Sequence, residues 1–374
     1  MKKLFSLLFF LTTFAYAQQD SVSLPDSLLL QQPEQSVSQS QYAGTTTRTI
    51  ISMNPDISAI GDFRSTFQSA SIRKVESYLH ALEVQLSSVI DPFATAHFLF
   101  SFGKDFTTNE YVAGLEEGTI TSTSLPMQLQ LKLGKFKPQF GKINALHPHA
   151  FSCVNFPRVN ELYFSDEGMF MDGLSLSWLV PNPFDFFQEL NIDVGRPEEN
   201  GSFVNGGATH LFSNVHLKNF FDLSDNSTIE LGISGLTGQN SFNFTTTMGN
   251  FDATYKWKPV QFNTYYSFTF QSEIYYQHLK YADALYTSKL GAYSFLEYQI
   301  EKLWFIGARF DYTELPVILT DIERSIAFLF RLQPSEFQIL ALQFQHTERT
   351  YAESDNQILF RIIFGIGTHA AHPY

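Results

Sequence analysis

The chain has 374 residues, a net charge of −13, a hydrophobic content of 44% and an aromatic content of 16%. The acidic balance argues against nucleic acid as a partner, which would require a basic surface, and the single cysteine, Cys153, excludes an internal disulfide. The modest hydrophobic content argues against a bundle of membrane-spanning helices but is compatible with a membrane β-barrel, in which half of each strand faces a polar lumen.

The N-terminus has the features of a secretory signal peptide. Lys2 and Lys3 precede the apolar stretch Leu4–Phe14, and Ala15-Tyr16-Ala17 is a cleavage site of the A-x-A type. The apolar stretch is shorter than the ~20 residues that a spanning helix needs. We therefore predict a signal peptide at 1–17, a flexible Gln/Ser/Thr-rich periplasmic lead-in at 18–48 and a transmembrane β-barrel at 49–374.

Short segments of alternating hydrophobicity follow one another through the rest of the chain. In residues 260–271, VQFNTYYSFTFQ, side chains such as Phe268 and Phe270 would share one face, and polar ones such as Gln261 and Gln271 the other. In an exported protein this pattern indicates a closed antiparallel β-barrel in the bacterial outer membrane, surrounded by lipid.

The pattern predicts about 16 strands, with 14 as the nearest alternative. Short turns and longer polar connections alternate along the chain, as in outer-membrane barrels, and both termini are expected on the periplasmic side. The terminal aromatic residue, Tyr374, suits recognition by the barrel-assembly machinery. The predicted strands are 57–66, 77–90, 92–104, 107–118, 127–137, 170–180, 186–196, 208–218, 227–237, 247–257, 260–271, 288–299, 303–313, 322–332, 336–347 and 355–366.

Ionisable residues on the polar phase of these strands are expected to face the lumen, because a Lys or Arg facing lipid at mid-depth would cost about 2–4 kcal/mol. The sequence leaves open whether they line an open pore or pair with one another in a filled interior. The set includes Glu83, His97, Lys132, Glu189, Asp193, Lys218, Glu230, Asp252, Lys256, Arg309, Asp311 and Arg361.

The longest connection, 138–169, is the best candidate for function. A loop of this length can fold into the lumen of a porin-like barrel and narrow it, so that its polar residues select ions or solutes. The alternative is an ordered cap whose Pro, Gly and aromatic residues pack on the rim. The residues predicted to form the constriction are Lys142, Asn144, Arg158, Asp166 and Glu167.

Two histidines of this connection, His147 and His149, are candidate metal ligands, because imidazole is a common ligand of zinc. His369 and His372 form a second pair, expected on the opposite side of the membrane. The alternative role of the first pair is to hold the loop by hydrogen bonds. We expect no cofactor. We also expect that the protein is not an enzyme, since the chain contains no G-x-S-x-G, H-E-x-x-H or P-loop motif.

Several blocks resemble a family of porin-like bacterial outer-membrane proteins, often labelled zinc-regulated TonB-dependent outer-membrane receptors. The resemblance rests on Leu133-Gly134-Lys135-Phe136, Gly141-Lys142-Ile143-Asn144, His147-Pro148-His149-Ala150 and Trp178-Leu179-Val180-Pro181, and on the opening Met53-Asn54-Pro55-Asp56. It implies metal-responsive uptake across the outer membrane. The lead-in 18–48 is too short for the plug domain of large TonB-dependent barrels, so the resemblance implies a porin-like barrel without a plug.

We therefore predict a channel for passive diffusion of small hydrophilic solutes or ions, with a mild preference for cations and a link to metal uptake. The alternative is a closed barrel that serves as a binding or structural surface protein. The expected partners are outer-membrane lipid, the assembly machinery and the solutes themselves. A trimer or another oligomer stays open, because the sequence contains no direct interface signal.

Overall fold

The computed structural model describes residues 55–69, 74–105, 108, 110–122, 124–184, 186–206, 211–316 and 320–367. All of them belong to one compact unit, Ser52–Tyr374. The predicted signal peptide and lead-in lie outside the described residues, as do His369, His372 and Tyr374.

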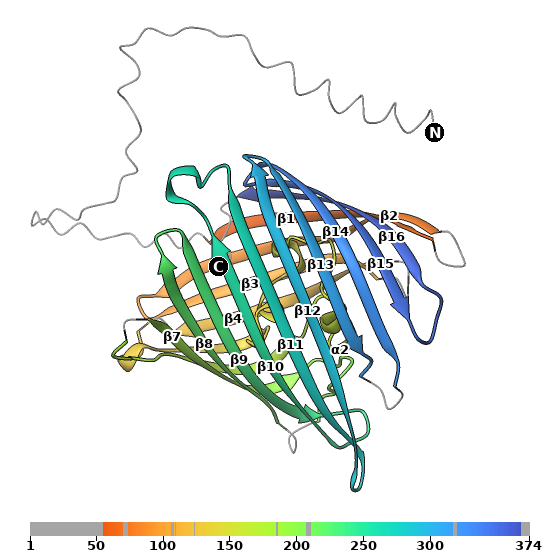
Figure 1. The fold of residues 1–374 in the computed structure, drawn as a ribbon. Coiled ribbons are helices and arrows are strands. Elements are labelled where there is room, and N and C mark those ends of the chain that lie inside the picture. Colours follow the sequence, from red (N-terminus) through yellow and green to blue (C-terminus); the bar gives the residue numbers. More distant parts are fainter. Residues whose placement is uncertain are drawn as a thin grey trace, which may run out of the picture. The chain divides into compact units, whose positions relative to one another are not determined.

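Sixteen β-strands make up this unit. Each pairs in antiparallel fashion with its neighbours in the sequence, and β1 pairs with β16 to close the barrel (Figure 1). This confirms the predicted fold class and the larger of the two strand numbers. The strands are β1 (Asp56–Gln68), β2 (Lys74–Asp91), β3 (Ala94–Asp105), β4 (Glu110–Ser122), β5 (Leu129–Phe136), β6 (Met171–Leu179), β7 (Phe187–Pro197), β8 (Phe212–Ser224), β9 (Ser227–Gln239), β10 (Thr245–Trp257), β11 (Ser267–Ala282), β12 (Leu285–Glu301), β13 (Trp304–Glu314), β14 (Ile322–Ser335), β15 (Gln338–Arg349) and β16 (Asp355–Gly367).

The strands bury and expose alternate residues, as β14 shows. Phe328 and Phe330 are exposed on the outside of the barrel, whereas Ser325, Leu329 and Arg331 are buried inside. Successive side chains of a strand point to opposite faces, so one face meets lipid and the other meets the lumen. The order of apolar and polar residues along each strand therefore determines which face lies inside.

Two predicted boundaries around β11 are wrong. Residues 260–266 form a short 3-10 turn, η7 (Val260–Phe262), and a connection rather than the start of a strand. Exposed aromatic residues such as Tyr266 extend the alternation of apolar and polar residues into this connection, which is why it resembles a strand in the sequence. The predicted long connection 272–287 is instead the β11–β12 hairpin. Its lumen-facing polar residues, such as the fully buried Gln277, give this hairpin the composition of a loop.

In the part of the chain that the structure describes, helical structure is confined to short pieces. One six-residue α-helix, α2 (Arg158–Tyr163), and two 3-10 turns, η4 (Ile143–Ala145) and η5 (Pro148–Ala150), lie in the connection between β5 and β6, and η3 (Pro126–Gln128) precedes β5. Among the described residues, no helix is both long and apolar enough to cross a bilayer.

Candidate functional site

The connection between β5 and β6, residues 137–170, lies inside the barrel and is called the inner loop below. Figure 1 shows α2 and the coils beside it within the ring of strands. Apolar side chains of the loop pack against apolar side chains of the inner wall and form one buried cluster. A packed apolar cluster in a barrel interior excludes water from that part of the lumen. Its principal members are Phe140, Ile143, Phe151, Val154, Phe156, Val159 and Tyr163 from the loop and Tyr275, Tyr293 and Phe295 from the wall.

Two buried arginines of the wall hold the middle of the inner loop. Arg361 donates hydrogen bonds to the carbonyl oxygens of Phe151 and Cys153 at 3.3 and 3.1 Å, and it pairs with Asp62 at 2.7 Å. Arg309 pairs with Asp311 at 3.0 Å and donates to the carbonyl oxygen of Asn155. These guanidinium groups therefore satisfy wall carboxylates and loop carbonyls together, as buried charges require.

A buried glutamate of β11 holds the beginning of the loop. The amide of Ile143 donates to Oε1 of Glu273 at 2.8 Å, and the hydroxyls of Tyr275 and Tyr293 donate to the same carboxylate. The backbone of Gly141, at φ 65°, passes directly over it, and a Cβ there would lie 2.1 Å from Oε2 of Glu273. Only glycine fits this position without displacing the anchor.

Gly141→Ala is therefore expected to loosen the inner loop and destabilise the folded barrel. The left-handed backbone alone costs a non-glycine residue of order 1–3 kcal/mol, and the contact with Glu273 adds to it. Urea unfolding of the detergent-solubilised barrel measures the change. The matched control is Gly235→Ala in β9, where an added Cβ has no atom within 4 Å. Equal stability of the two variants would contradict this account.

The structure separates the five predicted constriction residues into two groups. Lys142 pairs with Glu230 of β9 at 2.8 Å, and Arg158 pairs with Glu161 and with Glu323 of β14. Asn144 is fully buried: its side chain donates to the carbonyl oxygen of Pro138 and accepts from the amide of Met169. These three residues hold the loop in place.

The other two residues, Asp166 and Glu167, line a cavity of about 270 Å³ between the inner loop and the wall. Liquid water occupies about 30 Å³ per molecule, so this space holds about nine waters. Four of its charged residues are acidic and two are basic. They are Glu116, Asp166, Glu167, Glu198, Lys104 and Lys135.

Two strands of the wall that faces this cavity are irregular. In β4 the partner of Leu99 is Glu117 and the partner of Phe100 is Leu115, so Glu116 is an extra, bulged residue. In β2, Leu79 and Ala81 pair with consecutive residues of β1, so His80 between them is likewise an extra residue. Bulges redirect side chains, and here they add His80 and Glu116 to the lining of the cavity.

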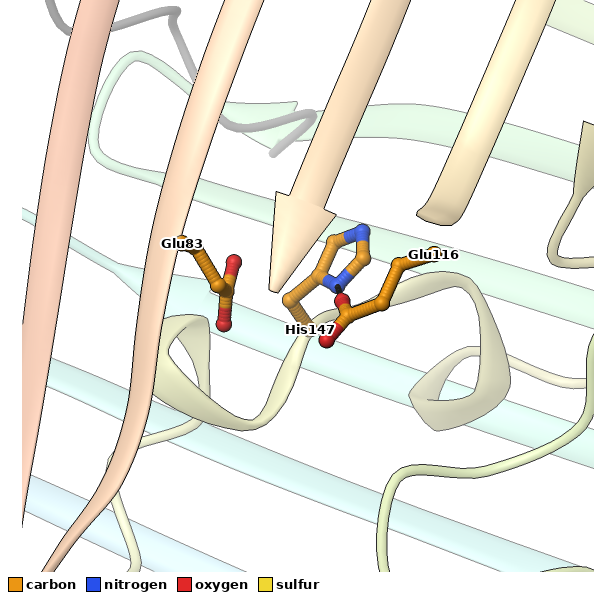
Figure 2. A group of neighbouring side chains, drawn as sticks. All are labelled: Glu83, Glu116 and His147. Carbon is orange, nitrogen blue, oxygen red and sulfur yellow. Dashed lines mark ion pairs between the residues drawn. The ribbon is translucent and has the colours of Figure 1, made fainter. Parts of the chain in front are cut away.

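The bulge in β4 places two consecutive carboxylates beside His147. Nδ1 of His147 lies 3.4 Å from Oε2 of Glu116, and Nε2 lies 3.3 Å from Oε1 of Glu117. Figure 2 shows Glu83, Glu116 and His147 with their polar ends turned toward one another. Burial by itself lowers the pKa of His147, but the neighbouring carboxylates outweigh it and raise the pKa to about 9.

The second histidine, His149, contacts two members of this group, Glu83 and His147. Nδ1 of His149 lies 3.0 Å from Oε1 of Glu83 in β2, and the rings of His147 and His149 are stacked with their centroids 5.7 Å apart. The two predicted metal-binding candidates therefore lie together, and carboxylates from β2 and β4 lie beside them.

Sequence reasoning did not single out Glu116, Glu117 or His80. For Glu116 and Glu117 the sequence did contain a signal, because strict alternation would turn one of two adjacent glutamates in a spanning strand toward lipid. A charged side chain on the lipid face is unfavourable, so the Glu116-Glu117 pair favours a bulge at this point of β4.

Comparisons with known proteins support the fold. No family model matches the chain. A protein of Aquifex aeolicus (strain VF5), described as uncharacterized, is 26% identical over 340 residues, which cover 79% of this chain and 70% of that protein. The anion-selective porin from Comamonas acidovorans has a TM-score of 0.57 at 9% identity, covering 84% of this chain and 99% of its own. The outer-membrane channel DcaP of Acinetobacter baumannii has a TM-score of 0.57 at 8% identity, covering 87% of this chain and 100% of its own. The chain thus has the fold of bacterial outer-membrane porins and channels.

Proposed function

We propose that this protein is a porin-like channel of the bacterial outer membrane, through which small hydrophilic solutes or ions diffuse passively. The observation that carries the proposal is the cavity beside the inner loop, whose lining includes six charged side chains. A pathway of this size admits ions and very small solutes and excludes larger ones. Within the described residues, the inner loop is the segment that fills the barrel.

The cavity also supports a preference for cations. Its carboxylates outnumber its lysines by four to two, and Asp166 is exposed to the space. Acidic linings raise the local concentration of cations. Divalent metal ions belong to the solutes that such a lining would concentrate, which is the support for a link to metal uptake.

Single-channel recording in planar bilayers, with a salt gradient across the membrane, tests the proposal directly. We expect small, stable conductance steps and a reversal potential whose sign indicates a preference for cations. The double variant Asp166→Asn/Glu167→Gln should shift the reversal potential toward zero while the barrel stays folded. A verified folded barrel that never conducts would overturn the channel proposal.

The pH dependence of this selectivity provides a further prediction. Burial raises the pKa of Glu167 to about 7, helped by the nearby Glu116 and Asp166. The carboxylate is charged above this pKa and neutral below it, so cation preference should fall between about pH 8 and about pH 6, one unit on each side. The reversal potential, measured across this range, should follow a titration curve with a single pKa. In Glu167→Gln the reversal potential should no longer depend on pH over this range. An unchanged profile in that variant would assign the titration to another group.

The second candidate function is a closed barrel that acts as a binding or structural surface protein. The specific observation in its favour is the apolar cluster formed by the inner loop and the wall, which blocks much of the lumen. This alternative predicts that the folded barrel is silent in the bilayer, so the same recording distinguishes the two.

A further inference from the structure

We propose that Glu83, Glu116 and His147 form a binding site for a divalent transition-metal cation at the edge of the cavity. The three residues come from β2, the β4 bulge and the inner loop, and one ligand atom from each lies within 4.8 Å of the other two. Metal binding at this site is independent of the proposed channel function. The role of the site in selecting a transported cation rests on that function.

The ligand types determine the class of ion. One imidazole nitrogen with two carboxylate oxygens suits zinc and neighbouring first-row divalent metals, whereas calcium and magnesium prefer oxygen ligands alone. Metal–ligand bonds of about 2.0–2.2 Å place two donors of one ion up to about 4 Å apart. Small side-chain adjustments would therefore bring the three atoms to one ion.

An unsatisfied buried oxygen at this place is a second, independent observation. Glu83 is 5% exposed, and its Oε2 accepts no hydrogen bond from any described residue. A buried carboxylate oxygen without a donor is unfavourable. A bound cation would compensate this oxygen, and the carboxylate of Glu83 belongs to the cluster with Glu116 and His147 (Figure 2).

Neighbouring groups are arranged to orient these ligands. His149 contacts the other oxygen of Glu83 at 3.0 Å, and Glu117 contacts Nε2 of His147, the ring nitrogen that would not bind the metal. Carboxylates that hold the second nitrogen of a ligating histidine are typical of metal sites. Glu116 also lines the cavity, so an ion bound there would have an open coordination position that water or another solute reaches, which favours exchange.

Metal titration of the folded, full-length barrel in detergent tests the site. We expect calorimetry with Zn²⁺ to show one saturable site, and Co²⁺ to produce a visible absorption band from nitrogen and oxygen ligands. Glu83→Gln, Glu116→Gln and His147→Gln should each abolish this site. Glu117→Gln should weaken it by about 10–100-fold, as expected for a group that orients a ligand. The matched control is His346→Gln, which removes a partly exposed histidine beside Glu348 in β15.

Binding that persists in all three ligand variants, or that disappears in His346→Gln, would overturn the proposal. If the ligand variants fail to fold, X-ray absorption of the zinc-loaded native chain decides, since one imidazole is expected and two or more would contradict the site. Conductance recorded on the same preparation keeps the two proposals separate. Binding without conductance would overturn only the channel, and conductance without binding would overturn only the metal site.

Discussion

Replacing residues 140–166 of the inner loop with a short Gly/Ser linker is expected to raise single-channel conductance several-fold. A 16-stranded barrel without an internal segment encloses an aqueous channel, and in this chain the inner loop fills much of that space with an apolar cluster. Without it, buried wall charges such as Arg361 and Glu273 would face water, which solvates them well. Single-channel recording in planar bilayers measures the effect.

A control for the loop replacement is a Gly/Ser substitution of Thr350 and residues 352–354 in the connection that joins β15 to β16. It keeps Tyr351, whose hydroxyl donates to Glu323, the partner of Arg158 in the inner loop. The contacts of the inner loop are therefore unchanged, and conductance should stay at the native value. If the inner-loop replacement folds and conducts no better than the native chain, the loop does not limit passage. The cavity would then lose its role as the pathway.

Arg309→Met is expected to destabilise the barrel by about 3–5 kcal/mol, because it leaves a buried carboxylate without its partner. Arg309 is 1% exposed, and it joins Asp311 to the carbonyl and side-chain oxygens of Asn155 in the inner loop. Its loss would leave Asp311 as an uncompensated charge and would detach the loop at this point. Urea unfolding of the solubilised barrel measures the change in the free energy of unfolding.

The double variant Arg309→Met/Asp311→Leu is the diagnostic control. Replacing a buried ion pair by apolar residues of similar volume is often nearly neutral, so much of the lost stability should return although the loop contact does not. A loss below about 1 kcal/mol in the single variant would show that water reaches Asp311 and solvates it. In that case the wall beneath the loop would be wet rather than packed.

Several features of the fold follow from local pattern alone. Alternation in segments such as β14 predicts strands and the face that each side chain occupies, because a strand turns successive side chains to opposite sides. The inward positions predicted for Asp193, Arg309 and Arg361 are buried inside the barrel in the structure. Polar lumen-facing residues of β11 and β12 misled the prediction of 272–287, since a strand with a polar inner face and a loop have similar compositions.

By itself, the sequence predicted about 16 strands, the alternation of lipid-facing and lumen-facing residues, and 138–169 as the candidate functional connection, because all three depend on periodicity and on distances along the chain. Tertiary structure alone decided that Lys142, Asn144 and Arg158 hold the inner loop whereas Asp166 and Glu167 face the cavity. It also decided that Glu83 and Glu116 lie beside His147. These contacts join residues far apart in sequence, and they depend on barrel closure and on one extra residue in β4, which breaks the alternation of that strand.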